Sequence, residues 1–111
     1  MNYHNKKFQV LKRSENGEIS ESMIFHYIQE GNILSCSYSD SIIEKGHLLG
    51  TVQEDGTIEM RYHQINSKGE LMSGECTSTP EILENGKIRL YEKWKWTSGD
   101  FLEGTSTLQE I

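Results

Sequence analysis

The stretch Ile88-Arg89-Leu90-Tyr91-Glu92-Lys93-Trp94-Lys95-Trp96 decides the fold class of this chain. Its even positions carry Ile, Leu, Glu, Trp and Trp, and its odd positions carry Arg, Tyr, Lys and Lys. Alternation with a period of two residues is typical of a β-strand with one buried face, whereas a helix would scatter the two groups around its axis. Glu92 stands out because the alternation places its carboxylate on the apolar face.

Turn signals divide the whole chain into segments of this kind. Six turns contain glycine, at residues 15–17, 30–32, 54–56, 67–69, 84–86 and 98–100, and a weaker one lies at 39–41. Glycine supplies the positive φ that tight hairpins require. The segments between the turns are rich in β-branched and aromatic residues, and we predict strands over 6–13, 18–29, 33–38, 42–53, 57–66, 70–81, 87–97 and 101–110.

The hairpin turns predict which residues face each other, because cross-strand partners point to the same side of a sheet. Closing the chain at residues 55, 68 and 99 pairs apolar residues inside, for example Val52 with Ile58, Met60 with Cys76, and Trp94 with Gly104. The same register pairs opposite charges outside, namely Arg61 with Glu75 and Lys95 with Glu103. Closing at residues 30–31 sets Tyr27 opposite Leu34, and closing at 16–17 sets Phe25 opposite Phe8.

One hairpin breaks this pattern, because a simple turn at Asn85-Gly86 sets outward Thr77 against inward Trp94. One extra residue restores the parity, and proline is found at bulges, so we predict a bulge or bend at Thr79-Pro80. Eight sequential hairpin strands predict an all-β fold, an eight-stranded antiparallel up-and-down meander barrel. The alternatives are an open, half-rolled sheet and an α+β fold in which 18–29 is helical.

Size and charge narrow the classes of partner. The chain has 111 residues, so we predict a single domain over 1–111. Its net charge of -6 repels phosphate backbones and anionic lipids, and no apolar run is long enough to span a membrane. We therefore expect neither nucleic acid nor a membrane as partner. We expect a cytoplasmic protein in which Cys36 and Cys76 are reduced and buried; the oligomeric state stays open.

The predicted inward face mixes polar and aromatic side chains, and these are the candidate ligand-binding residues: Tyr38, Glu44, Tyr62, Gln64, Glu92, Trp94, Trp96 and Ser106, beside Cys76. Such a mixture can line a pocket for a small molecule. The interior of a small barrel can equally be filled by side chains, in which case the tryptophans are core.

Few residues carry candidate chemistry. Glu92 is the weak catalytic candidate, because a carboxylate on an apolar face needs a hydrogen-bond partner or a raised pKa, and Ser106 is its predicted neighbour. His47 and His63 face each other across a predicted outer ladder and are weak metal candidates, but two ligands do not make a site. We expect no cofactor, since no catalytic or metal-binding spacing occurs.

A resemblance extends over nearly the whole chain. At residues 61–66, 69–74, 76–90 and 94–100, including Trp94-Lys95-Trp96-Thr97-Ser98-Gly99-Asp100, the sequence resembles a family of small bacterial proteins, some of which are called N-acetylglutamate synthase. The inferred architecture is similar to the lipocalin, fatty-acid-binding and avidin barrels. We therefore expect a small-molecule-binding barrel. The alternatives are an enzyme that uses the same cavity, with Glu92 as acid or base, and a structural or protein-interaction module.

Overall fold

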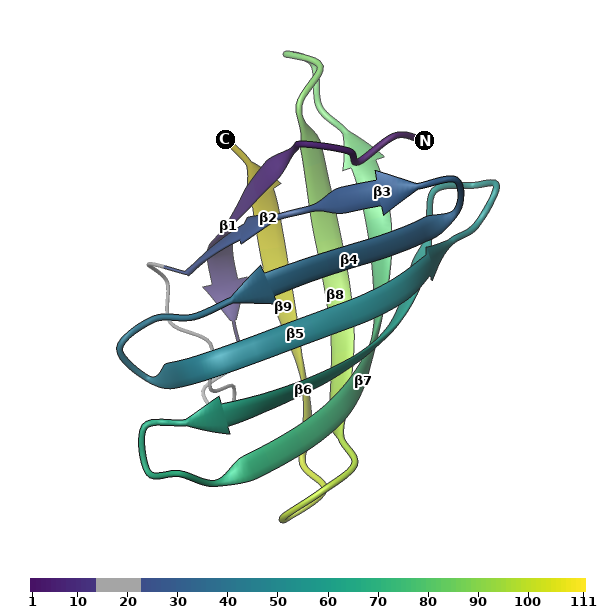
Figure 1. Cartoon of the computed structure of the whole chain (residues 1–111). Helices are drawn as coiled ribbons and strands as arrows, with labels where there is room; N and C mark the ends of the chain where they lie inside the picture. Colours follow the sequence, from purple (N-terminus) through teal and green to yellow (C-terminus); the bar gives the residue numbers. More distant parts are fainter. Residues whose placement is uncertain (14–22) are drawn as a thin grey trace.

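The computed structural model describes residues 1–13 and 23–111, which form a single antiparallel sheet of nine strands (Figure 1). The strands are β1 (Lys7–Arg13), β2 (Ile24–His26), β3 (Ile28–Glu30), β4 (Ile33–Tyr38), β5 (Ile43–Val52), β6 (Ile58–Asn66), β7 (Leu71–Ile82), β8 (Ile88–Trp96) and β9 (Glu103–Glu110). The described residues contain no helix, and hence none that is long and apolar enough to cross a membrane. The predicted all-β class is confirmed.

The two strands at the ends of the sheet, β2 and β3, belong to one continuous stretch of chain, and this stretch nearly closes the sheet into a barrel. The strand order is β2-β1-β9-β8-β7-β6-β5-β4-β3, yet β2 and β3 follow each other in the chain with only Tyr27 between them. The first half of this stretch pairs with β1 and the second half with β4. The predicted single strand 18–29 is therefore two short strands over its described part, which explains nine strands where we expected eight. The helical alternative for 18–29 is wrong for 24–29, and residues 18–22 lie outside the described part.

Most of the predicted hairpin register is confirmed. Val52 pairs with Ile58, Met60 with Cys76, and Trp94 with Gly104, all as expected. The outer charge partners also lie opposite each other: Arg61 with Glu75 and Lys95 with Glu103. The Arg61 Nε lies 3.6 Å from the Glu75 Oε2 in an exposed ion pair. The meander is therefore correct from β5 to β9.

The predicted bulge at Thr79-Pro80 is wrong. β7 and β8 pair without a register shift, so that Cys76 faces Trp94 and Pro80 faces Leu90. The parity is restored in the turn, because the Leu83 N–H donates to the Lys87 carbonyl at 2.8 Å and leaves a three-residue loop. The loop ends in Gly86 with φ of 83°, the left-handed residue that such loops require.

Two other expectations need correction. At the β3–β4 hairpin we predicted Tyr27 opposite Leu34, but Gln29 is the residue that pairs with Leu34. The pairing is shifted by two residues, and because two is the period of a strand, each side chain stays on the predicted side of the sheet. In addition, the β5–β6 ladder has a bulge between Ile43 and Lys45. A bulge adds one residue to one strand and reverses the alternation beyond it. As a result Glu44, which we predicted to face inward, is exposed.

The N-terminal segment covers one end of the barrel (Figure 1). Tyr3 is fully buried, with its ring centroid 6.3 Å from that of Phe8 and 6.3 Å from that of Tyr27. Its hydroxyl donates to the Gly56 carbonyl in the β5–β6 turn at 2.5 Å. The backbone N–H of Tyr3 donates to the Gln29 Oε1 at 2.8 Å. These bonds to distant elements tie the segment across the barrel, so the Tyr3 side chain plugs this end.

Candidate functional site

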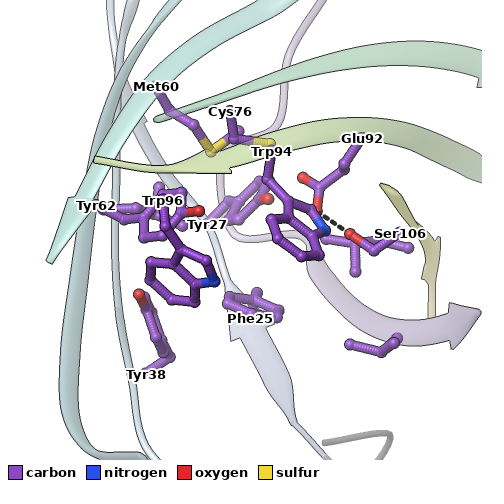
Figure 2. A pocket seen from close by; sticks show the side chains of 13 residues that line it. Phe25, Tyr27, Tyr38, Met60, Tyr62, Cys76, Glu92, Trp94, Trp96 and Ser106 are labelled. Atoms are coloured by element: carbon purple, nitrogen blue, oxygen red, sulfur yellow. Dashed lines mark hydrogen bonds between the residues drawn. The ribbon is translucent and has the colours of Figure 1, made fainter. Parts of the chain in front are cut away.

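A partly enclosed cavity lies inside the barrel, and Figure 2 shows the side chains that line it. The cavity has a volume of about 40 Å³. This is small for a ligand site, so the cavity admits only a compact group of a few heavy atoms. Side chains thus fill most of the interior and leave one small space. Its walls are Val10, Phe25, Tyr27, Tyr38, Leu48, Met60, Tyr62, Cys76, Glu92, Trp94, Trp96, Ser106 and Leu108.

Aromatic rings from four strands form much of the wall. Trp94 and Trp96 come from β8, and their ring centroids lie 6.2 Å apart. Tyr62 of β6 meets Trp96 edge-on, with centroids 5.4 Å apart and an interplanar angle of 75°. Phe25 of β2 and Tyr38 of β4 form a tilted pair, with their ring centroids 5.1 Å apart. Edge-on and tilted contacts of this kind are favourable arrangements of ring quadrupoles, so the rings fix one another's orientation.

Two glycines make room for two of these rings. A Cβ at Gly46 would overlap the ring of Tyr38, and a Cβ at Gly74 would overlap the ring of Tyr62. Each glycine is the cross-strand partner of the tyrosine whose ring covers it: Gly46 lies opposite Tyr38, and Gly74 lies opposite Tyr62. The missing side chains therefore let both tyrosines lie flat along the inner wall.

Glu92 provides the carboxyl group of the cavity and is only 7% exposed. The Ser78 hydroxyl donates to its Oε2 at 2.5 Å, and the Ser106 hydroxyl donates to its Oε1 at 3.2 Å. Burial raises the pKa of Glu92, and the hydrogen bonds from Ser78, Ser106 and Cys76 lower it by less. Burial therefore shifts Glu92 toward its protonated, uncharged form compared with a carboxyl group in water, while both serine hydroxyls are placed to solvate the carboxylate once it ionises.

The other titratable groups in the cavity are uncharged over the ordinary pH range. Burial raises the pKa of the Tyr27 hydroxyl and of the Cys76 thiol well above their usual values, and it raises the pKa of Tyr62 in the same direction. No lysine, arginine or histidine is among the described residues that line the cavity. Glu92 is therefore the group that can change charge there, and the Cys76 thiol is held in a form that is a poor nucleophile.

A second polar contact lies just outside the cavity wall. The Tyr38 hydroxyl donates to the Gln64 Oε1 at 2.9 Å. Gln64 is 2% exposed, and its Nε2 has no hydrogen-bond partner among the described residues. Gln64 faces inward as predicted, but its role on this geometry is to orient Tyr38 and not to line the cavity.

The structure brings most of the predicted residues together. Tyr38, Tyr62, Glu92, Trp94, Trp96 and Ser106 all line one cavity, and Ser106 faces Glu92 as predicted. Glu44 lies outside it. Ser78 was not predicted from the sequence, although strand alternation places it on the inner face two residues after Cys76. Phe25 and Tyr27 were not predicted as cavity residues either, although Phe25 pairs with Phe8 as expected and only the pairing of Tyr27 with Leu34 is shifted.

The histidine pair lies on the outer surface. His47 faces His63 across the β5–β6 ladder, as predicted, and their ring centroids are 5.8 Å apart. No group of three or more metal-binding side chains occurs among the described residues. The pair alone therefore lacks the ligands of a metal centre.

The fold and the cavity together define a class: an antiparallel β-barrel with a small aromatic chamber inside. The family model of the avidin-like proteins, described as "Avidin-like protein", matches residues 1–111. The chain belongs to the avidin-like family, a barrel architecture associated with small-molecule binding in general. No curated protein and no solved structure is similar enough to the chain to count as a match.

Proposed function

We propose that this protein is a small-molecule-binding barrel whose ligand enters the aromatic cavity beside Trp94, Trp96, Tyr62 and Glu92. One observation carries this proposal: an avidin-like barrel retains a partly enclosed, aromatic-walled space next to a buried carboxyl group. A barrel packed only for stability gains from closing such a space with larger side chains, because empty volume in a core is destabilising. A retained space with one polar group in its wall is the usual form of a ligand site.

The size of the space limits the ligand. Sites for drug-sized ligands and cofactors usually have volumes of about 300–1,000 Å³, well above what this cavity can enclose. Only a group of a few heavy atoms fits within the walls. Because the cavity is partly open, the rest of a longer ligand extends out of it.

The same features favour binding over catalysis. An N-acetylglutamate synthase has to hold a bulky acetyl donor together with glutamate, and this cavity has no room for both. Its one thiol, that of Cys76, is held protonated by burial. Glu92 is the one acid or base available, and no second charged group assists it among the described lining residues.

Tryptophan fluorescence tests the proposal directly. The natively purified protein is denatured and the released small molecules are identified by mass spectrometry, and each candidate is then titrated against wild-type protein. A ligand at about 100 times its Kd stabilises the folded state by about 2.7 kcal/mol, so thermal unfolding provides a second readout. We expect Trp96→Leu to abolish both signals and Tyr91→Leu to preserve them. Tyr91 is the matched control, since it lies on the outer face of the same strand and is 43% exposed.

Two outcomes would contradict this function. If no released molecule or metabolite fraction changes the fluorescence or the unfolding temperature, the binding function is wrong. The alternative of a structural or protein-interaction module then replaces it. If a ligand is turned over by wild-type protein and not by Glu92→Gln, the protein is an enzyme. The proposal includes a cytoplasmic location, which the two buried and unbridged cysteines support, and cell fractionation tests it.

A further inference from the structure

We infer that the cavity recognises a small organic cation, and specifically that a methylated ammonium head group sits among Trp94, Trp96 and Tyr62 with the Glu92 carboxylate as its counter-ion. This inference rests on the proposed function, because it names the class of ligand for the same site. Its basis is the combination of aromatic faces, one acid and no base in a space of this size.

The aromatic wall favours a cation over other small ligands. The face of an indole or phenol ring carries negative potential, and Trp is the strongest of the side chains in attracting a cation. Trp94, Trp96 and Tyr62 are held at angles to one another, with centroids 6.2 Å apart for the two indoles and 5.4 Å for Trp96 and Tyr62. Rings held at angles to one another can contact a compact head group from more than one direction. Aromatic cages are the usual form of a site for a quaternary ammonium.

The charges in the cavity exclude the opposite ligand class. An anion would enter an apolar chamber that has no lysine, arginine or histidine among its described lining residues and that contains a carboxyl group. Leaving a charge buried without a partner costs several kcal/mol. The net charge of -6 for the whole chain acts in the same sense at longer range, by raising the local concentration of cations. The ligand is thus neutral or cationic, and Glu92 decides between the two.

Glu92 is equipped to switch from a neutral acid to a counter-ion. The hydroxyls of Ser78 and Ser106 lie at 2.5 and 3.2 Å from its two oxygens, and burial shifts the carboxyl toward its protonated form compared with one in water. When a cation enters, the carboxyl O–H bond breaks, the proton passes to solvent, and the carboxylate accepts one hydrogen bond from each serine. Cation binding therefore releases up to one proton per ligand, and the affinity rises with pH.

Among the described residues that line the cavity, no other group around Glu92 produces this pH dependence; Lys12 and Lys93 border a separate hollow with Glu92 and do not line the cavity. Ser78 and Cys76 face it from β7, Ser106 from β9, Tyr27 from between β2 and β3, and Tyr62 from β6. The serines do not titrate, and burial keeps the thiol and both phenols protonated. A pH-dependent affinity between about pH 5 and about pH 8 thus reports on Glu92.

The size of the cavity fits the head group and not a larger cation. The space is small, so a methylated ammonium head group is the part of the ligand that occupies it, and a longer arm passes out through the open side. Choline is a suitable probe, and 3,3-dimethyl-1-butanol is its uncharged counterpart of nearly the same shape. Any difference between the two measures the positive charge alone.

The experiment is a calorimetric and tryptophan-fluorescence titration of wild-type protein with both probes at about pH 5 and about pH 8. We expect choline to bind at least about tenfold more tightly than the alcohol at the higher pH, with proton release, and the alcohol to show no rise in affinity with pH. Glu92→Gln keeps the shape of the side chain. It should weaken choline binding by about tenfold or more and remove the proton release.

The outcomes separate this inference from the proposed function. Binding of the alcohol as tightly as choline overturns the cation class but leaves a small-molecule site in place. Choline binding that does not change with pH or with Glu92→Gln overturns the role of the carboxylate. No response to either probe overturns the inference, while the screen of released molecules continues to test the function. The wild-type pH series needs no variant, so the inference stays testable even if Glu92→Gln fails to fold.

Discussion

Replacing Gly46 by alanine provides a sharp test of the inner wall. The added Cβ would overlap the ring of Tyr38, which is buried and only 6% exposed. This ring cannot move aside without losing its hydrogen bond to the Gln64 Oε1, 2.9 Å long, and its packing against Phe25, 5.1 Å between centroids. A methyl group that is small by itself therefore disturbs three side chains.

The expected magnitude follows from three terms. Overpacking of a core typically costs about 1–3 kcal/mol, and the lost hydrogen bond costs about 1 kcal/mol more. Alanine in place of glycine in a strand returns about 0.5–1 kcal/mol, because the unfolded chain loses less entropy. We expect Gly46→Ala to lower the free energy of unfolding by about 1–3 kcal/mol, which shifts the midpoint of urea denaturation by about 1 M.

Two control variants identify the cause. Gly74→Ala also places a Cβ against a tyrosine ring, but Tyr62 is half-buried and its outer edge can turn toward solvent, so this loss should be smaller. In a Tyr38→Leu background the loss caused by Gly46→Ala should largely disappear, as a double-mutant cycle measures. A parent-like or higher midpoint for Gly46→Ala alone would show that the ring of Tyr38 does not lie over Gly46. An undiminished loss in the Tyr38→Leu background would refute the same contact.

Three further predictions concern other buried groups. Because burial raises the pKa of Glu92 above its ordinary 4.5, the folded state holds the proton more tightly. The free energy of unfolding should then fall as the pH rises above about 4.5, by up to about 1.4 kcal/mol per pH unit, until Glu92 ionises in the folded protein; denaturation of Glu92→Gln should lack this component. Burial raises the pKa of the Cys36 thiol to about 11, so native protein should resist a thiol reagent that labels denatured protein at once, and rapid native labelling would contradict the burial. Tyr3→Phe removes the hydroxyl that donates to the Gly56 carbonyl and should cost about 1–3 kcal/mol in thermal or chemical unfolding, whereas an unchanged stability would show that the plug does not depend on this bond.

The local sequence determined the strands and the side of the sheet that each residue occupies. Alternation in residues 88–96 places Glu92 with Trp94 and Trp96 on the inner face, and the glycine turns at 54–56 and 67–69 set the register of β5, β6 and β7. Both signals are short-range: side chains alternate with a period of two, and a turn fixes only the residues next to it. Six of the eight predicted ligand-binding residues therefore do line the cavity.

Only the tertiary structure decided the features that depend on distant parts of the chain. One inserted residue between Ile43 and Lys45 moves Glu44 out of the barrel, and no local pattern marks that bulge. The division at Tyr27 arises because one stretch must pair with β1 on one side and β4 on the other in order to close the sheet. The Tyr3 plug and the small volume of the cavity depend on how rings from several strands pack together. Packing density is a property of all these side chains at once, so strand alternation alone could not show how much space remains beside Glu92.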